Sequence, residues 1–138
     1  MMRRQNGLAL LESLIATLLL AIGLLGAIGM QARAYSALSD AGMRAEATMA
    51  SEKLLALMSI DQAKLSSYAY TGTGAPNAKI AQWVADTRGL IPGAGLVVQV
   101  TPVASTSRSV INIAVSWRRK QGGATNQHRI TSYIANSQ

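Results

Sequence analysis

The sequence predicts an α+β fold, in which a long N-terminal helix packs on a small antiparallel sheet of about three strands. Residues 8–60 contain no proline and are rich in alanine and leucine, which favour helix. Residues 96–135 instead contain three runs of β-branched residues, separated by turns that contain serine or glycine. A chain of 138 residues has room for one such domain and, at most, an appendage.

The first half of the predicted helix, residues 8–32, has the composition of a membrane span. Glu12 is the only charged residue of this segment. About 20 apolar helical residues are roughly 30 Å long, which is the thickness of the hydrocarbon core of a bilayer. Arg3 and Arg4 precede the segment, so the positive-inside rule places the N-terminus in the cytoplasm and the rest of the chain outside.

The second half of the predicted helix continues to about residue 60 and is amphipathic. Its apolar stripe recurs at i, i+4, i+7, i+11 and i+14, and we expect this face to be buried: Met43, Ala47, Ala50, Leu54 and Leu57. On the polar side, Asp40 and Arg44 have the i,i+4 spacing of an ion pair. The inner half of the helix is therefore apolar all round, and the outer half has one face to bury.

Residues 61–94 are predicted to form a loop and a short helix. Ser66 to Pro76 reads as a loop by composition. A short helix is expected over Asn77–Thr87, with Asn77 as N-cap and Gly89 as the stop signal. Trp83 is expected to anchor the core from this helix, and a turn over residues 90–95 follows.

The sheet is predicted over residues 95–136 as a three-stranded antiparallel meander. Its strands are expected at Leu96–Val103, Ser109–Trp117 and Gln127–Ala135. One face of the sheet should be polar, and the other should lie on the outer half of the long helix.

No catalytic or metal-binding set emerges from the sequence. Cysteine is absent, which excludes a disulfide framework and any Cys-based metal site or nucleophile. The six carboxylates are far apart in sequence and His128 is the only histidine, so no metal-ligand cluster, cofactor or enzymatic activity is predicted. The basic run Arg118-Arg119-Lys120 fits a solvated turn. The more specific alternative is that these residues contact DNA or an acidic partner.

Three interpretations compete for the N-terminal segment. A secretory signal peptide would be cleaved near Ala32-Arg33-Ala34, although the apolar stretch is longer than the usual signal. An uncleaved single-pass anchor would leave Glu12 at the membrane interface. The third interpretation uses a short basic leader, residues 1–7, which ends in glycine and is followed by Glu12 at the fifth position after Gly7. This arrangement resembles the class III leader of type IV prepilins and pseudopilins.

The resemblance implies a processing site between Gly7 and Leu8. In that family a membrane-embedded aspartyl peptidase, the prepilin peptidase, cuts after the glycine and N-methylates the new terminus, which would here be Leu8. The family usually has Phe and Thr at the positions of Leu8 and Ala9. The resemblance further implies that Glu12 meets the N-terminal ammonium of a neighbouring subunit and sets the register between subunits. A buried carboxylate is tolerated only when it is paired or neutralised.

Further motifs narrow the resemblance. "AIGLLG" at residues 21–26, "LIPGAG" before the first strand and "INIAVSWRR" at residues 111–119 are similar to the PilV-type minor pilins, the type IV pilus modification proteins. Small pseudopilins of type II secretion share much of this pattern. The helix also carries glycines at every third position, Gly23, Gly26 and Gly29, which would let neighbouring backbones approach closely in a membrane.

The resemblance implies a pilin-like fold with a leader at residues 1–7, a membrane and assembly helix at 8–32 and a periplasmic domain at 33–138. The expected function is that of a minor pilin that helps to assemble or prime the type IV pilus, and hence affects adhesion, twitching motility or DNA uptake. Its expected partners are the prepilin peptidase, other minor and major pilins, the inner-membrane assembly machinery and membrane lipid. The alternatives are a small type II secretion pseudopilin and a periplasmic binding domain on an uncleaved anchor.

Overall fold

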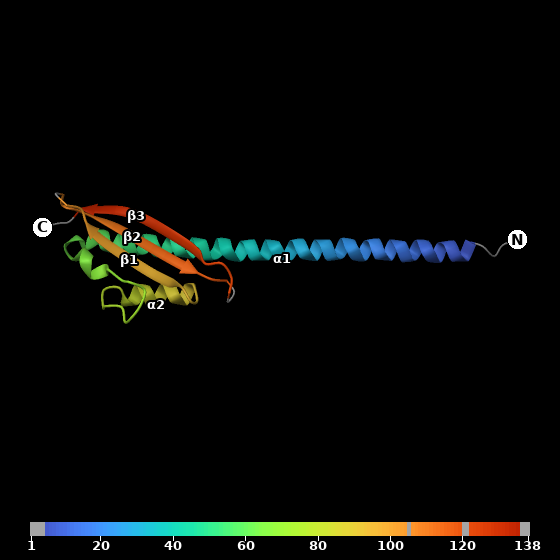
Figure 1. Ribbon diagram of the computed structural model, residues 1–138, viewed down its shortest axis with the longest axis horizontal. Helices are drawn as coiled ribbons and strands as arrows, with labels where there is room; N and C mark the ends of the chain where they lie inside the picture. The colour runs from blue at the N-terminus through green and yellow to red at the C-terminus, as the bar shows by residue number, and fades with distance from the viewer. Residues whose placement is uncertain (1–4, 105, 120–121, 136–138) are drawn as a thin grey trace. The chain divides into compact units, whose positions relative to one another are not determined.

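The computed structural model describes residues 5–104, 106–119 and 122–135 (Figure 1). The elements, in chain order, are α1 (Gln5–Ile60), the 3-10 helix η1 (Gln62–Tyr68), α2 (Ala81–Leu90), β1 (Gly95–Pro102), β2 (Arg108–Trp117) and β3 (Asn126–Ala135). The predicted α+β fold, a long helix packed on a three-stranded antiparallel sheet, is confirmed. The chain divides into two compact units, Met1–Ser39 and Asp40–Gln138, and each is described by itself.

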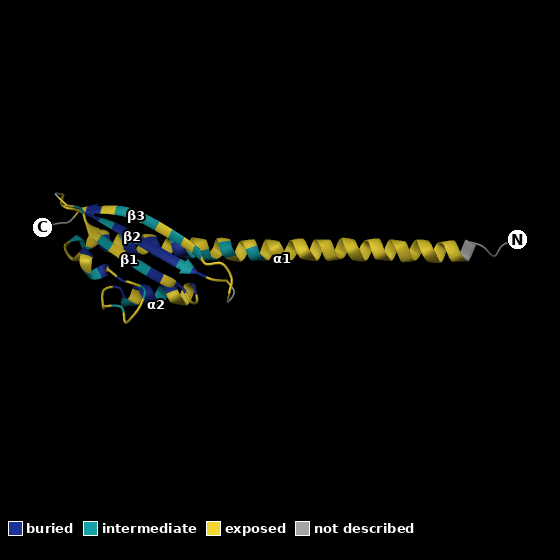
Figure 2. Cartoon of the chain, viewed as in Figure 1, coloured by how far each residue is buried: buried dark blue, intermediate teal, exposed yellow. Residues whose placement is uncertain are grey.

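The first unit is the N-terminal part of α1, and almost none of it is buried. Its described side chains from Gly7 onward are exposed, apart from the half-buried Ser36 (Figure 2). Among the described residues, α1 is the one helix that is long and apolar enough to cross a membrane. The absence of proline and the dominance of leucine and alanine explain why the segment is helical without any packing partner in this unit.

The sheet of the second unit has the order β1-β2-β3 with antiparallel neighbours, which confirms the predicted meander. Val98 of β1 lies opposite Ile113 of β2, and Ile113 lies opposite Ile130 of β3. Alternate residues of a strand point to the same face, so this register places one apolar row across the sheet. The inward residues of β2 are all buried: Ser109, Ile111, Ile113, Val115 and Trp117.

The core lies between this sheet face and the outer half of α1. Ala47, Ala50 and Leu54 are buried as predicted, whereas Leu57 is 42% exposed and Met58 is fully buried instead. Met58 lies about one helical turn after Leu54, on the same side of the helix as Ser51. Ser51 is also fully buried. The prediction for Leu57 was therefore wrong, because the packed stripe is centred further round the helix than the i+14 spacing suggested.

α2 packs through Trp83, which is 3% exposed and donates its indole N–H to the carbonyl oxygen of Ala50 at 2.7 Å. The helix begins at Ala81, later than predicted, because the Asn77 side chain caps the preceding turn. It also runs through Gly89 to Leu90, so Gly89 is not the stop. The turn after the helix is made by Gly93, whose φ of 73° L side chains rarely adopt.

The predicted loop at residues 66–76 is partly structured. Its first residues belong to η1, which ends at Tyr68. Tyr70 then pairs with Val98 across the outer edge of β1, with N–H···O distances of 2.9 and 2.8 Å. Both tyrosines are buried, so this segment covers the edge of the sheet and its aromatic side chains complete the core.

Candidate functional site

The predicted processing and assembly residues lie on the first turns of α1. The helix begins at Gln5, so the bond between Gly7 and Leu8 lies within a helical segment. Leu8 is 72% exposed. A shallow depression on this helix surface is lined by one carboxylate and five apolar residues: Leu8, Leu11, Glu12, Ile15, Ala16 and Leu19. The structure therefore brings Leu8 and Glu12 together on one face, one helical turn apart.

Glu12 has no cationic neighbour in its own helix segment. The described residues from Gln5 to Ala32 contain no lysine, arginine or histidine. Arg33 is 21 residues away, which is about 30 Å along a helix. Within the described part of the first unit, Arg33 is thus the basic residue nearest in sequence to Glu12, and it is too far away to neutralise the carboxylate.

The two hydroxyl side chains that follow Glu12, those of Ser13 and Thr17, bond carbonyl groups of their own helix. The Ser13 hydroxyl donates to the Leu10 carbonyl at 2.9 Å, and the Thr17 hydroxyl is within 3.0 Å of the carbonyls of Ser13 and Leu14. Such bonds let a hydroxyl enter an apolar environment at little cost. In this helix segment Glu12 is thus the group whose burial would require an outside partner.

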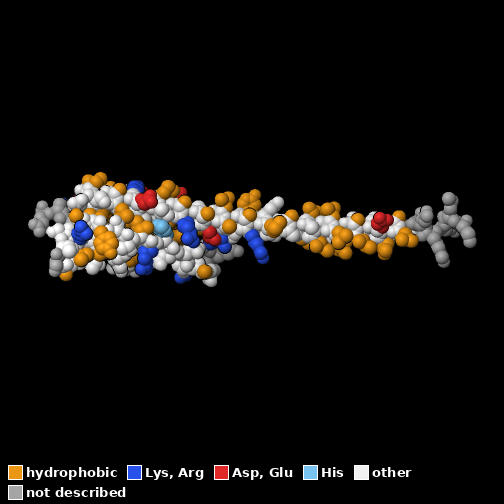
Figure 3. Space-filling view, turned by 90° about the horizontal axis from the view of Figure 1, so that it is seen from above, with side chains coloured by type: hydrophobic (Ala, Val, Ile, Leu, Met, Phe, Trp, Pro, Cys, Tyr) orange, Lys and Arg blue, Asp and Glu red, His pale blue; other side chains and the backbone are white. Residues whose placement is uncertain are grey.

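The three glycines at positions 23, 26 and 29 make no close contact within the chain. A Cβ added at any of them would meet no heavy atom within 4 Å. Exposed hydrophobic side chains cover much of the N-terminal part of α1 (Figure 3). Close packing of these glycines against another helix remains a prediction, and their lack of side chains leaves notches in an otherwise apolar surface.

Ion pairs join segments of the second unit that are distant in sequence. Asp40 bonds Arg119 at 2.7 Å, so its carboxylate does not make the predicted pair with Arg44. Asp86 of α2 bonds Lys53 of α1 at 2.9 Å.

A third ion pair, between Asp61 and Lys79, includes Tyr68, whose hydroxyl donates to Asp61 at 3.1 Å. The Lys79 ammonium holds the pKa of the Asp61 carboxyl below its ordinary value, and the bond to Asp61 raises the pKa of Lys79. Burial, followed by the bond to Asp61, raises the pKa of Tyr68. Lys53 likewise lowers the pKa of Asp86. Asp61, Lys79 and Tyr68 together fix the segment after α1 to the turn before α2.

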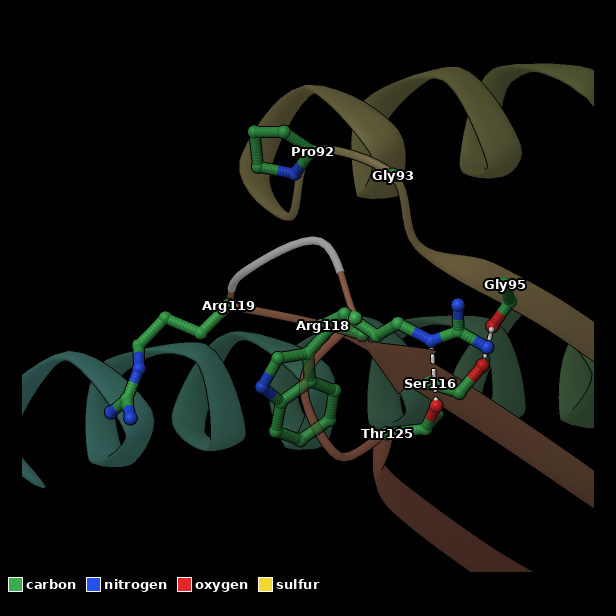
Figure 4. Close-up of a pocket in the computed structure, with 9 residues that line it drawn as sticks. Pro92, Gly93, Gly95, Ser116, Arg118, Arg119 and Thr125 are labelled. Atoms are coloured by element: carbon green, nitrogen blue, oxygen red, sulfur yellow. Dashed lines mark hydrogen bonds between the residues drawn. The ribbon is translucent and has the colours of Figure 1, made fainter.

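The basic run divides at the end of β2. Arg118 and Arg119 both line a cleft beside Gly95 and Ser116, but their side chains extend in opposite directions (Figure 4). Lys120 lies outside the described residues. This division was not foreseen from the sequence, because adjacent basic residues give no local signal of which one has an acidic partner.

The described residues contain no group of three or more His, Cys, Asp or Glu side chains that could hold a metal ion. His128 is half-buried on β3, opposite Val115 of β2.

Comparisons with known proteins return no match: the chain matches no family model, no curated protein and no solved structure. Function is therefore inferred from the chemistry of α1 and of the Asp40–Gln138 unit.

Proposed function

We propose that this chain is a minor pilin, a non-catalytic structural subunit of the type IV pilus. It is made as an inner-membrane precursor with a cytoplasmic N-terminus and a periplasmic domain. Prepilin peptidase cuts it between Gly7 and Leu8, and the exposed helix then packs with the same helix of other pilins. The observation that carries the proposal is an unpacked apolar helix whose only carboxylate before Asp40 is Glu12, five residues after a glycine.

The apolar helix supports this function because it needs an apolar environment outside its own unit. Its large hydrophobic side chains are about half to three-quarters exposed, from Leu8 at 72% to Ile15 at 49%. Burying one such side chain contributes about 1.5–3 kcal/mol. Membrane lipid supplies that environment before assembly, and the helices of neighbouring subunits supply it in the filament.

Glu12 gives the assembly its specificity. Removal of the leader creates an ammonium group at Leu8, and in a bundle of such helices the ammonium of one subunit pairs with Glu12 of the next. The pairing satisfies the carboxylate, which has no cation in its own segment, and fixes the axial register between subunits. Losing one member of a buried ion pair costs roughly 3–5 kcal/mol.

The mature N-terminus distinguishes the competing assignments. Mass spectrometry of the membrane-extracted protein should find N-methylated Leu8 if the chain is a processed pilin or pseudopilin. An N-terminus after Ala34 would indicate a secreted domain, and retention of the leader would indicate a plain anchor. Either of these two results would overturn the proposal.

The role of Glu12 is tested by Glu12→Ala. The variant should be inserted and processed normally, but should be lost from sheared pili by at least tenfold relative to the unaltered chain. Glu52→Ala is the matched control, since Glu52 is an exposed carboxylate on the same helix within the second unit. Normal recovery of Glu12→Ala in pili would refute the assembly role. Recovery of the unaltered chain in a type II secretion filament instead of a pilus would favour the pseudopilin alternative.

A further inference from the structure

An open cleft of about 690 Å³ lies at one end of the sheet, where β1 begins and β2 ends. Pro92 and Gly93 lie on one side, and Arg118 and Thr125 lie on the other, with Gly95 beside Ser116 (Figure 4). This volume falls in the range of about 300–1,000 Å³ that is usual for ligand-binding sites. All of its described lining residues belong to the second unit.

Arg118 is held in place by a neighbouring side chain. Its Nε–H donates to the Thr125 hydroxyl oxygen at 2.8 Å, which fixes the plane of the guanidinium. The terminal N–H groups bond no other described residue, although a guanidinium has five N–H donors. Arg119 differs, because its guanidinium bonds Asp40. The structure thus leaves one oriented and uncompensated positive charge at the cleft.

The lining of the cleft favours an anion. None of the described lining residues is acidic, and the Asp40 carboxylate is already bonded to Arg119. A planar guanidinium with free terminal N–H groups matches a carboxylate, which it binds through two parallel hydrogen bonds.

Two glycines line the cleft, and their surroundings differ. A Cβ at Gly95 would lie 2.6 Å from the Ser116 hydroxyl oxygen, so a side chain there would collide with the cleft wall. Gly93 faces open space and has a φ of 73°. The Ser116 side chain thus covers Gly95, whereas the space beside Gly93 is open to the backbone of a second chain.

We propose that this cleft binds an acidic segment of a partner protein, with an Asp or Glu carboxylate of that segment held by Arg118. The cleft is much larger than a single carboxylate, so it accommodates a short peptide. Nucleic acid fits this cleft less well. Tight binding of a nucleic-acid backbone depends on several phosphate contacts, and single strands also stack their bases on exposed aromatic rings. The aromatic residue among the described lining, Trp117, is only 2% exposed. The proposal does not depend on the pilin assignment.

The test uses the full-length chain in detergent micelles and a fluorescein-labelled octapeptide of Gly and Ser with two central Glu residues. The matched probe has Gln in place of both Glu residues. Fluorescence anisotropy at 0.15 M salt should detect binding of the Glu peptide at least tenfold tighter than binding of the Gln peptide. Arg118→Gln should weaken binding of the Glu peptide by tenfold or more, which corresponds to about 1.4 kcal/mol. Thr125→Val should weaken it by several-fold, because the guanidinium loses its orientation.

Arg108→Gln is the control for net charge, since Arg108 is an exposed arginine at the start of β2, at the other end of that strand. It should change the dissociation constant by less than twofold. Circular dichroism melts verify that each variant is folded, and Arg118→Lys, which keeps the charge, should retain part of the binding. Equal binding of the two peptides, or an equal loss in Arg108→Gln, would overturn the proposal. Arg118-dependent binding of a 16-base-pair DNA duplex more tightly than the Glu peptide would also overturn it.

Discussion

Replacing each of the two buried tryptophans with phenylalanine should have different effects on stability. Trp83 is 3% exposed and Trp117 is 2% exposed, so both substitutions remove part of a buried indole. The Trp83 indole donates to the Ala50 carbonyl oxygen at 2.7 Å. The Trp117 indole nitrogen is buried and has no hydrogen-bond partner among the described residues. Comparing the two variants therefore separates the contribution of the hydrogen bond to stability from the cost of the lost ring volume.

The expected magnitudes follow from these contacts. Trp83→Phe loses a hydrogen bond with a net value of about 0.5–1.5 kcal/mol. It also leaves a void of roughly 40 Å³, which costs about 1 kcal/mol at ~24 cal/mol per Å³. The total loss in the free energy of unfolding should be about 1.5–2.5 kcal/mol. In Trp117→Phe the same void cost is offset by removal of an unpaired buried N–H, whose burial costs about 1–3 kcal/mol, so the net change should lie near zero.

Urea unfolding of the full chain in micelles, followed by far-UV circular dichroism, measures both changes without relying on tryptophan emission. Tyr133→Phe serves as a control, because Tyr133 is 67% exposed and the substitution should cost less than about 0.5 kcal/mol. Losses that agree within about 0.5 kcal/mol for the two tryptophan variants would refute the assigned role of the Trp83 hydrogen bond.

Two further predictions concern the segment around η1. Gly72→Ala should destabilise the fold by about 2–4 kcal/mol, because its φ is 89° and a Cβ would lie 2.8 Å from the Leu96 carbonyl oxygen. Gly74→Ala, with a similar φ but open space, should cost only about 1 kcal/mol in the same urea assay, and equal costs would contradict the contact argument. The lowered pKa of Asp61 and Asp86 means that their ionised forms stabilise the fold above about pH 4 and that this contribution is lost as the pH falls further. Thermal melts between pH 6 and 2 should therefore show a weaker acid dependence for Asp61→Asn than for the unaltered chain, and identical slopes would contradict the assigned ion pair.

The fold and part of the candidate site could be predicted from the sequence because they depend on local patterns. The helical periodicity of residues 43–54 and the β-branched runs of the three strands identify elements whose side chains repeat with fixed geometry. Glu12 could be singled out in the same way, since a lone charge in an apolar helix is visible in the sequence itself. The faces of the strands followed from their alternation, and the register confirmed a single buried face.

Details that depend on where distant segments meet could not be predicted. Leu57 is 42% exposed because the position of the sheet, and not the helix alone, decides which side of α1 is covered. Tyr70 covers the edge of β1 from a segment whose composition is that of a loop.

What the sequence by itself determined is an apolar N-terminal helix with one carboxylate, followed by an α+β domain, because helix and strand periods and the cost of an isolated charge are properties of neighbouring residues. Only the tertiary structure decided that Arg119 bonds Asp40, 79 residues away, while Arg118 faces a cleft. Two adjacent arginines are chemically identical until the fold places a carboxylate beside one of them and leaves the other without one.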